Sequence, residues 1–459
     1  MKLLKAILLV PILLALLAGT ALAKIAPQHS GVDPTFGRGG TIAVSVPKGF
    51  GEGPLQMATA PSGKSYVLDG SLLYAFGANG LPDHGFGDNG HVQVAAAAGE
   101  TTKVTGLAVD AQGRILVSGS VNPIPGVANE AVPPKSAYAL YHPAPSNAFV
   151  IRYLPGGEPD TSFGGTGEIE VTLTPPARTG SALETAHFEH LVTSADRLAV
   201  VNGETPVLGG SYLYYVDYCY FTGVQAHAFA AAIDPAGPAT QSIAPTAYTQ
   251  FEPSDVTVFA AMPGGNLAVL SGGSGSCSNR GAPGPLTLST LDFGSTPAPA
   301  LDPARPRILI SSLAVDGQGR FLGLESPYSN PFEAPSQWWK LMRLLPNGDF
   351  DPAFGSNGGV PLKKFGEESV GALIVGAKER PVVAGGDSKF RLVRLGTKGK
   401  VDHSFGRHGS VEVGFGNGTK ATPSAMTVDS KGRILVAGRV TSTALKSGEG
   451  IGLTRVTEK

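Results

Sequence analysis

The feature that most constrains this chain is an eight-residue motif, D-x-x-F-G-x-x-G, that recurs five times. Its copies, which we call boxes, cover residues 33–40, 83–90, 160–167, 351–358 and 402–409. Two apolar residues separated by one position follow each box, and this alternation is typical of a half-buried strand. The chain is therefore an array of repeated units.

Two further motifs complete the unit. The sequence L-A-V-D-x-x-G-R-I-L-V-x-G predicts a tight hairpin, because Asp bonds its own turn and Gly adopts positive φ. A third motif is an apolar strand that ends in a polar turn, at residues 148–154, 340–344, 390–395 and 451–456. Clear or close hairpin copies cover residues 107–119, 313–324 and 427–438, and weaker ones lie near residues 57–68, 191–201, 258–270 and 373–385.

Motif spacing sets the number of units. The gap of 191 residues between Phe163 and Phe354 holds three units whose two internal boxes have diverged, near Pro238 and Pro297. The hairpin motif then occurs seven times, about once per 60 residues. With 63 Gly and 37 Pro for turns, we predict an all-β fold, a seven-bladed β-propeller of four-stranded antiparallel blades.

These motifs resemble the bacterial delta-60 repeat, a propeller-like repeat of exported proteins. The boxes and the hairpins carry the resemblance, which covers residues 32–456, although residues 172–307 depart from the pattern. The resemblance implies a propeller fold and export. It implies no known activity, and it supplies no set of catalytic residues.

The first 23 residues are predicted to be a secretory signal peptide. Lys2 and Lys5 precede an apolar run over residues 6–18, and residues 21–23 read Ala-Leu-Ala, a small-x-small cleavage pattern. A membrane anchor is the alternative, but the run is short for one. We expect a short linker over residues 24–31, a single propeller domain of seven delta-60-like repeats over residues 32–459, and a periplasmic or extracellular location with no membrane span after cleavage.

The two cysteines, Cys219 and Cys277, are a candidate disulfide. They fall at matching positions in consecutive repeats, and an even pair can oxidise in an exported protein. Two unrelated thiols are the alternative. A bond would close a loop of about 58 residues, for which chain entropy allows at most about 4 kcal/mol.

The box residues are expected to be structural. Phe is predicted to be an apolar wedge between blades, Asp to accept turn N–H groups, and Gly to permit left-handed backbone. Metal binding is the rival, but each box offers one constant carboxylate, where a calcium loop needs several oxygen ligands. The residues concerned are Asp33, Phe36, Gly37, Asp83, Phe86, Gly87, Asp160, Phe163, Gly164, Asp351, Phe354, Gly355, Asp402, Phe405 and Gly406.

Connections of variable length are predicted to gather on one face of the propeller. The hairpin turns and boxes are constant in length, whereas the connections that alternate with them vary, including inserts at 121–147, 204–227, 272–285, 325–337 and 439–450. Variable loops on a rigid scaffold usually carry binding. Both cysteines fall in such inserts.

Aromatic residues in these connections are the candidate binding residues. Six aromatic residues occur between positions 212 and 221, which favours a platform for a sugar or a protein. A self-packed flap is the alternative. The candidates are Tyr212, Tyr214, Tyr215, Tyr218 and Tyr220, with the adjacent Trp338 and Trp339.

Three functions stay open at this level. The chain carries 35 Lys and Arg against 36 Asp and Glu, and this balance argues against a nucleic-acid partner. No catalytic motif is found, so no catalytic residue, metal ligand or cofactor is predicted. A non-enzymatic scaffold for a protein or glycan ligand is favoured, with a propeller hydrolase or lyase using the central channel and a structural envelope component as alternatives.

The phase of the repeat is also open. The strand after each box is either the innermost strand of its own blade or the outermost strand of the preceding one. In the second case, the strand at 41–46 closes the ring against the C-terminal unit.

Overall fold

The computed structural model describes residues 31–47, 55–95, 102–121, 147–173, 185–217, 222–243, 254–274, 283–291, 310–327, 338–366 and 368–458. Within them the secondary structure is β-strand, apart from three short 3-10 helices, η1 (Pro263–Gly265), η2 (Lys363–Phe365) and η3 (Ala377–Glu379). No helix in these ranges is long and apolar enough to cross a membrane. The predicted signal peptide and all of the linker except Gly31 lie outside the described residues.

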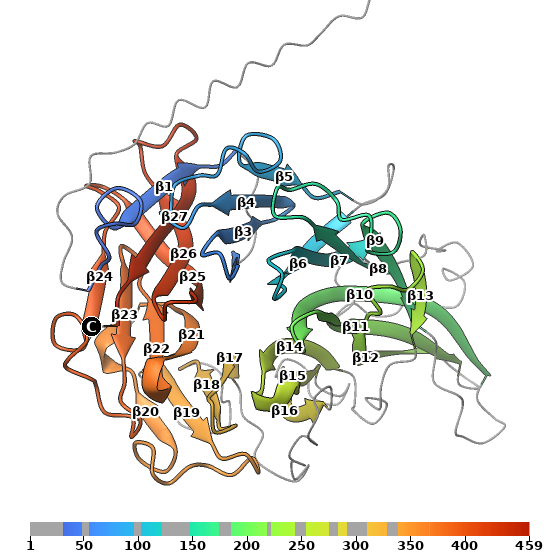
Figure 1. Ribbon diagram of the computed structural model, residues 1–459. Helices are drawn as coiled ribbons and strands as arrows, with labels where there is room; N and C mark the ends of the chain where they lie inside the picture. Colours follow the sequence, from blue (N-terminus) through green and yellow to red (C-terminus); the bar gives the residue numbers. More distant parts are fainter. Residues whose placement is uncertain are drawn as a thin grey trace, which may run out of the picture.

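Three sheets have four antiparallel strands that follow one another along the chain (Figure 1). Each begins with a hairpin, continues with the strand of the third motif and ends with the strand that follows the box. The strands are β2 (Gln56–Thr59), β3 (Ser65–Asp69), β4 (Leu72–Phe76) and β5 (His91–Gln93); β17 (Ile310–Val315), β18 (Phe321–Glu325), β19 (Lys340–Leu344) and β20 (Gly359–Pro361); and β21 (Val370–Gly376), β22 (Arg380–Gly385), β23 (Phe390–Arg394) and β24 (Ser410–Val413).

The last sheet takes its outer strand from the opposite end of the chain. Its order is β25 (Lys420–Val428), β26 (Ile434–Thr441), β27 (Glu449–Val456) and then β1 (Thr41–Ser45). Thr41 pairs with Thr454, and Ser45 pairs with Gly450. The strand after each clear box is therefore the outermost strand of a blade, and β1 closes the ring.

One sheet has a fifth strand. It contains β6 (Thr102–Val109), β7 (Ile115–Val121), β8 (Asn147–Tyr153) and β9 (Glu168–Leu173) as an antiparallel blade, and β13 (Thr240–Ile243) pairs in parallel with β9. β13 follows the diverged box near Pro238. It joins the neighbouring blade instead of completing its own.

Two sheets have three strands among the described residues. They contain β10 (Thr185–Val201), β11 (Thr205–Asp217) and β12 (Thr222–Ala232), and β14 (Ser254–Ala261), β15 (Leu267–Ser274) and β16 (Pro283–Leu291). The fold is a β-propeller with four-stranded antiparallel blades, as predicted, but the prediction that every unit has four strands does not hold over the described residues.

The hydrophobic core lies between the sheets. Each cluster of buried apolar residues in the described ranges joins two neighbouring sheets. The first strands of the sheets contact one another in the closed order β2, β6, β10, β14, β17, β21, β25 and back to β2. The sheets therefore stand around a common axis, and one face of every sheet packs on the next.

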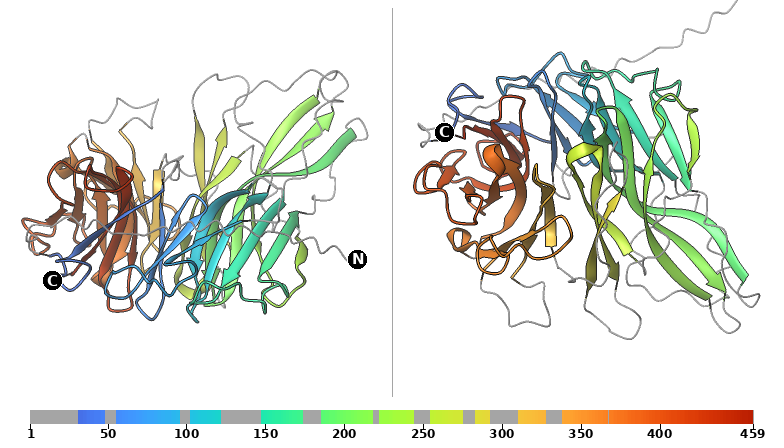
Figure 2. Two further views of the ribbon diagram at one scale, coloured as in Figure 1. Left: turned by 90° about the horizontal axis from the view of Figure 1, so that it is seen from above. Right: turned by 60° about the horizontal axis from the view of Figure 1, so that its bottom comes forward.

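The β10–β12 sheet corrects two predictions. The hairpin expected within 191–201 lies later, because β10 runs unbroken to Val201 and the turn follows at Asn202 and Gly203, which have φ of 53° and 79°. Asn-Gly is the preferred pair for a two-residue hairpin turn. The segment expected as an insert at 204–227 is mainly strand, paired from Val207–Ala232 to Asp217–Thr222. Figure 2 shows β10–β12 extending beyond the neighbouring blades.

The two faces of the ring differ. The box face carries the turns between the first and second strands and the boxes between the third and fourth. The loop face carries the remaining connections. Among the described residues, its turn between second and third strands spans two residues after Asp69, four after Gly385 and seven after Thr441. The predicted separation of constant and variable connections is present in the described blades.

Candidate binding surfaces

The box of the β21–β24 blade shows how the repeated motif is used. Arg394 on β23 is fully buried, and its Nε donates to Asp402 Oδ2 at 3.0 Å. Its Nη2 donates to Ser404 Oγ at 3.0 Å, and its guanidinium lies 4.6 Å from the ring centroid of the buried Phe405. Asp402 Oδ1 accepts the backbone N–H of Ser404 at 3.1 Å. The carboxylate thus fixes its own turn and also neutralises a buried arginine.

The same three side chains meet in three other blades. In each, an arginine on the third strand is paired with the box Asp and lies over the box Phe. A cation over an aromatic ring contributes up to about 2 kcal/mol when it is desolvated. The sets are Arg152, Asp160 and Phe163, with 4.6 Å from guanidinium to ring; Arg343, Asp351 and Phe354, with 4.4 Å; and Arg455, Asp33 and Phe36, with 4.8 Å.

The box also links each blade to the next. Nη1 of Arg394 donates to the carbonyl of Glu458 in the following blade at 2.9 Å. The box Gly supplies a second link, since Gly37 N–H donates to the carbonyl of Asn79 at 2.6 Å. Gly87 makes the equivalent bond to Gly156, and Gly355 to Lys398. Through these contacts, the box residues connect neighbouring blades.

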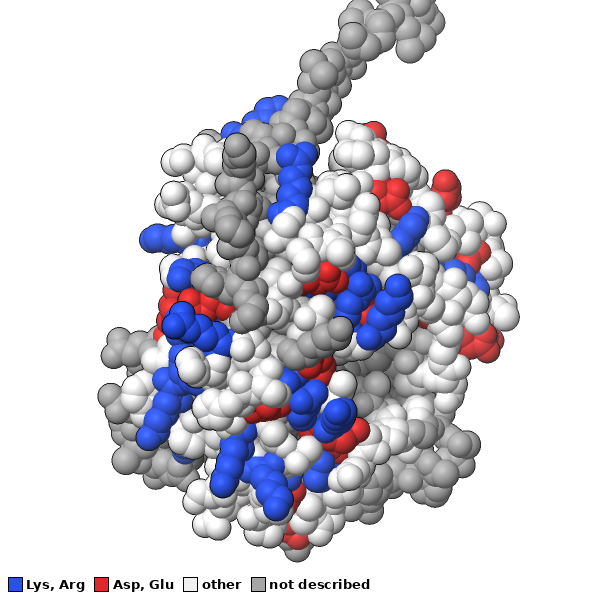
Figure 3. Space-filling model, turned by 60° about the vertical axis from the view of Figure 1, so that its left-hand side comes forward, with Lys and Arg blue, Asp and Glu red and all other residues white. Residues whose placement is uncertain are grey.

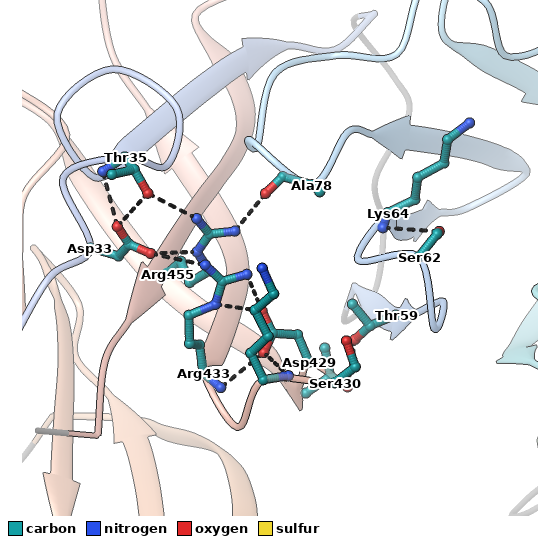
Figure 4. Close-up of polar contacts among 12 residues, drawn as sticks. Asp33, Thr35, Thr59, Ser62, Lys64, Ala78, Asp429, Ser430, Arg433 and Arg455 are labelled. Atoms are coloured by element: carbon teal, nitrogen blue, oxygen red, sulfur yellow. Dashed lines mark hydrogen bonds and ion pairs between the residues drawn. The ribbon is translucent and has the colours of Figure 1, made fainter.

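The hairpin Asp and Arg extend this network at the ring closure (Figure 4). Arg433 Nε donates to Asp429 Oδ2 at 2.7 Å, while its Nη1 lies 3.3 Å from Asp33 Oδ2. Arg455 Nε lies 2.9 Å from the same oxygen. Asp33 from one end of the chain is thereby held by two arginines from the other end.

Hydrogen bonding determines the charge state of the box carboxylates. Burial alone would raise the pKa of Asp402, but hydrogen bonds from Ser404 and the nearby guanidinium groups outweigh it and lower the pKa to about 2. The pKa values of Asp33 and Asp160 are lowered against burial in the same way by their Thr and Ser neighbours and their arginines. These carboxylates are therefore ionised at neutral pH.

The β2–β5 blade departs from this arrangement. Ala75 occupies the position of the buried arginine, and Tyr66, its cross-strand partner on β3, fills the space. The Tyr66 ring lies 5.6 Å from Phe86, and Lys64 takes over as the partner of Asp83 at 2.7 Å. The Tyr66 hydroxyl is buried and has no hydrogen-bond partner, and burial raises its pKa to about 12. An aromatic side chain has replaced a buried cation.

The aromatic candidates are only partly within the described residues. The backbones of Tyr212, Tyr214 and Tyr215 belong to β11, where Tyr212 pairs with His227 and Tyr215 with Val224. They therefore lie in an extended strand, and not in the loop expected from the sequence. Tyr218 and Tyr220 lie outside the described residues, as do Cys219 and Cys277 of the candidate disulfide.

The two tryptophans lie at the loop-face end of β19. Trp338 and Trp339 are both half-buried. Trp339 packs against the cluster between the β17–β20 and β21–β24 blades, and its carbonyl accepts the N–H of Leu362 at 2.7 Å. Both residues are therefore partly exposed near the variable connections.

The innermost strands of neighbouring blades contact one another through polar groups. Thr59 Oγ1 donates to Thr427 Oγ1 at 3.0 Å, and the N–H of Leu107 donates to Gln56 Oε1 at 3.0 Å. In the part of the chain that is described, no three His, Cys, Asp or Glu side chains gather as metal ligands. On the box face, the lowered pKa values of Asp33, Asp160 and Asp402 belong to carboxylates of the interblade network.

Charge is unevenly distributed along the chain. Residues 338–458 contain 18 Lys and Arg against 11 Asp and Glu, while the rest contains 17 against 25. Figure 3 views the side of the molecule formed by the last blades, where Lys and Arg are spread widely over the surface. The neutral total noted from the sequence thus conceals a basic region.

Comparison with known proteins identifies no family. No protein-family model and no curated protein match the sequence. Among solved structures, YCF48 from Cyanidioschyzon merolae has 11% identity and a TM-score of 0.42, over 90% of this chain and 98% of that chain. A Hadza microbial sialidase has 11% identity and a TM-score of 0.39, over 88% and 66% of the two chains. A luciferin-regenerating enzyme has 11% identity and a TM-score of 0.34, over 78% and 92%.

Proposed function

We propose that this chain is an exported, non-enzymatic, seven-bladed β-propeller that binds a protein or glycan ligand through its loop face. The contrast between the two faces carries the proposal. Box-face turns are tied into the scaffold by repeated hydrogen bonds, whereas loop-face connections differ from blade to blade and include the extended β11–β12 hairpin. A rigid support with one diversified face is the usual design of a binding module.

The aromatic residues provide the binding chemistry of the proposal. β11 contains Tyr212, Tyr214 and Tyr215, and Trp338 and Trp339 lie partly exposed at the same face. Tyr and Trp offer a large apolar surface together with a polar group, so they suit both sugar rings and peptide side chains. The three-stranded sheets count as blades in this proposal, which gives seven units around the axis.

Export to the periplasm or the extracellular space is a separate part of the proposal. It is supported by the signal-peptide pattern at residues 1–23 and by the resemblance to the delta-60 repeat. The test is expression of the full chain, followed by N-terminal sequencing of the product outside the cytoplasm. Sequencing should begin at Lys24. A product that stays in the cytoplasm with Met1 intact would rule out this part.

Binding is tested by shortening the hairpin. Gly210 pairs with Phe229, so replacing residues 211–228 with Asn-Gly closes β11 and β12 by a two-residue turn in the existing register. Wild type and variant are applied to an array of immobilised glycans and to an array of peptides. The proposal expects signals that wild type gives and the variant loses, with the same denaturation midpoint for both.

A matched control changes the other face. Arg407→Ser on the box face should keep every array signal attributed to the hairpin. Absence of any glycan or peptide signal with wild type, or equal signals for the shortened variant, would contradict the proposal. Conversion of an arrayed glycan into products would favour the enzyme alternative.

A further inference from the structure

Six cations on the box face of the last two blades form no ion pair with any other residue that the structure describes. Arg407, Lys398 and Lys400 lie in the turn and box of the β21–β24 blade, and Arg38 lies in the box that precedes β1. Lys378 and Lys431 occupy the hairpin turns of the same two blades. All six are exposed. We call them the basic surface.

Four carboxylates of this region are engaged by scaffold groups. Asp402 and Asp33 are held by buried arginines of the box network. Glu458 accepts the N–H of Ala377 at 2.8 Å, and Glu379 accepts the N–H of Gly317 at 2.7 Å. These four carboxylates therefore each have a partner within the scaffold, while the six cations face solvent.

The turn that carries Lys378 is held in a costly conformation. Lys378 and Glu379 both have left-handed backbone, with φ of 58° and 57°, where the other hairpins use Gly. Such a conformation persists only where neighbouring contacts enforce it. Here Glu379 binds the preceding blade and Glu458 of the following blade binds the turn, so Lys378 is presented at a fixed place.

The basic surface has boundaries. The box position occupied by Arg38 and Arg407 holds Asp88 in the β2–β5 blade and Ser356 in the β17–β20 blade. The turn position of Lys400 holds Asp349 in the β17–β20 blade. Cations at these repeat positions are thus confined to two neighbouring blades, and repeat structure alone does not require them.

Apolar anchors are missing from this surface. The large hydrophobic side chains that are exposed among the described residues, Leu81, Leu154 and Phe350, belong to other blades. Protein interfaces usually centre on buried aromatic or aliphatic anchors, and single-stranded nucleic acids on aromatic stacking. A ligand for the basic surface must be recognised mainly by charge.

We propose that the basic surface binds a linear anionic polysaccharide, through its carboxylate or sulfate groups. Arginine binds such planar or multi-oxygen anions with two parallel hydrogen bonds, and lysine adds a mobile charge. A flexible polymer with a charge on each sugar can follow cations on separate turns. Rigid duplex DNA would run past the boundary onto the neighbouring blades, where Asp88 and Asp349 occupy the equivalent positions. This inference goes beyond the proposed function, because it uses the opposite face.

The experiment uses residues that the repeat already tolerates. In the triple variant Arg38→Ser, Arg407→Ser and Lys400→Asp, each new residue occurs at the same position of the β17–β20 blade. The full chain is titrated with polygalacturonate and with heparin, with neutral dextran as the uncharged probe. The control is the double variant Lys420→Ser and Lys446→Ser, two exposed lysines on the loop face.

We expect wild type and the loop-face control to bind one or both anionic polymers with equal affinity, and dextran to give no signal. The triple variant should bind about tenfold more weakly, because three exposed ion pairs are lost. Affinity should fall as salt is raised. The hairpin-shortened protein should keep this binding, which separates failure here from failure of the proposed function.

Three results would overturn the inference. Wild type that binds neither polymer at low salt has no such site. A triple variant that binds as wild type does, with unchanged stability, places the binding elsewhere. A 30-base-pair DNA duplex that binds while both polysaccharides do not would assign the surface to nucleic acid.

Discussion

Removing the buried arginine of one box should lower the free energy of unfolding of the propeller, and a blade that lacks this arginine shows how the loss is compensated. Arg394→Ala takes away a fully buried side chain that bonds Asp402, Ser404 and the carbonyl of Glu458. Breaking a buried ion pair costs about 3–5 kcal/mol in the free energy of unfolding. Asp402 keeps Arg380 at 2.9 Å, so the lower end, about 3 kcal/mol, is expected.

The β2–β5 blade shows how that loss is compensated. There Ala75 faces Tyr66 across the strands, and Val382 holds the position of Tyr66 opposite Arg394. Val382→Tyr in the Arg394→Ala background should therefore place a ring over Phe405. Burial of the ring and its aromatic contact should recover about 2–3 kcal/mol of the loss. In the wild-type background the same tyrosine should overpack the core and destabilise by about 1–3 kcal/mol.

The assay is urea unfolding of wild type, the two single variants and the double variant, followed by intrinsic fluorescence. The double variant should be more stable than Arg394→Ala alone, so the coupling between the two positions is favourable and exceeds about 2 kcal/mol. The slope of the unfolding free energy against urea concentration should be the same for all four proteins. A loss below about 0.5 kcal/mol for Arg394→Ala, or a double variant less stable than either single one, would refute the account of the box.

Three other perturbations test the closure, the turns and the charge state. Deleting residues 24–47 removes β1 and should lower the unfolding midpoint of the whole domain, and a deletion protein that melts as wild type does would refute closure by β1. Gly80→Ala puts a Cβ about 2.5 Å from the buried Phe36 ring and should lower the free energy of unfolding by about 2–4 kcal/mol in denaturant titrations. The control is Gly70→Ala, where φ is 57° and the space around the new Cβ is open, and it should lower the same free energy by about 1 kcal/mol. The pKa of Asp402 is lowered to about 2 in the fold, so the stability that its ionised form contributes is complete above about pH 4 and is lost as pH falls towards 2. Asp402→Asn should therefore reduce the change in unfolding free energy between pH 4 and pH 2 by about 2 kcal/mol. An unchanged dependence of the unfolding free energy on pH would contradict the arginine–carboxylate network.

Regular blades were predictable because local chemistry repeats in them. Each box combines a turn-forming Asp, a buried Phe and glycines at positive φ, such as Gly355 and Gly406. The buried arginines were missed, although a signal was present. Arg152, Arg343 and Arg394 each precede a box Asp by eight residues, and that regular spacing pairs one cation with each anion.

The middle of the chain was harder because its pairing is not local. The Asn202-Gly203 turn could have been found, since that pair favours a hairpin, but the apolar run before it suggested an earlier turn. Parallel pairing of β13 with β9 joins residues about 70 positions apart, and no turn residue marks such a contact. The sequence could not show that Arg407 lacks a carboxylate partner among the described residues, because that depends on which carboxylates are already paired in the folded blades.

Closure by β1 has a consequence for the order of folding. The β2–β5, β17–β20 and β21–β24 blades consist of consecutive strands, so each can form as soon as its own segment is available. Pairing Thr41 with Thr454 must wait for nearly the entire chain, and closing so long a loop costs about 5 kcal/mol in chain entropy. An open ring should therefore precede the native state, with the apolar cluster of Phe36, Ile42 and Leu453 exposed at its ends. Joining these two ends should be the slowest and most aggregation-prone step of folding. The intermediate that precedes it should be a nearly complete propeller with an open ring.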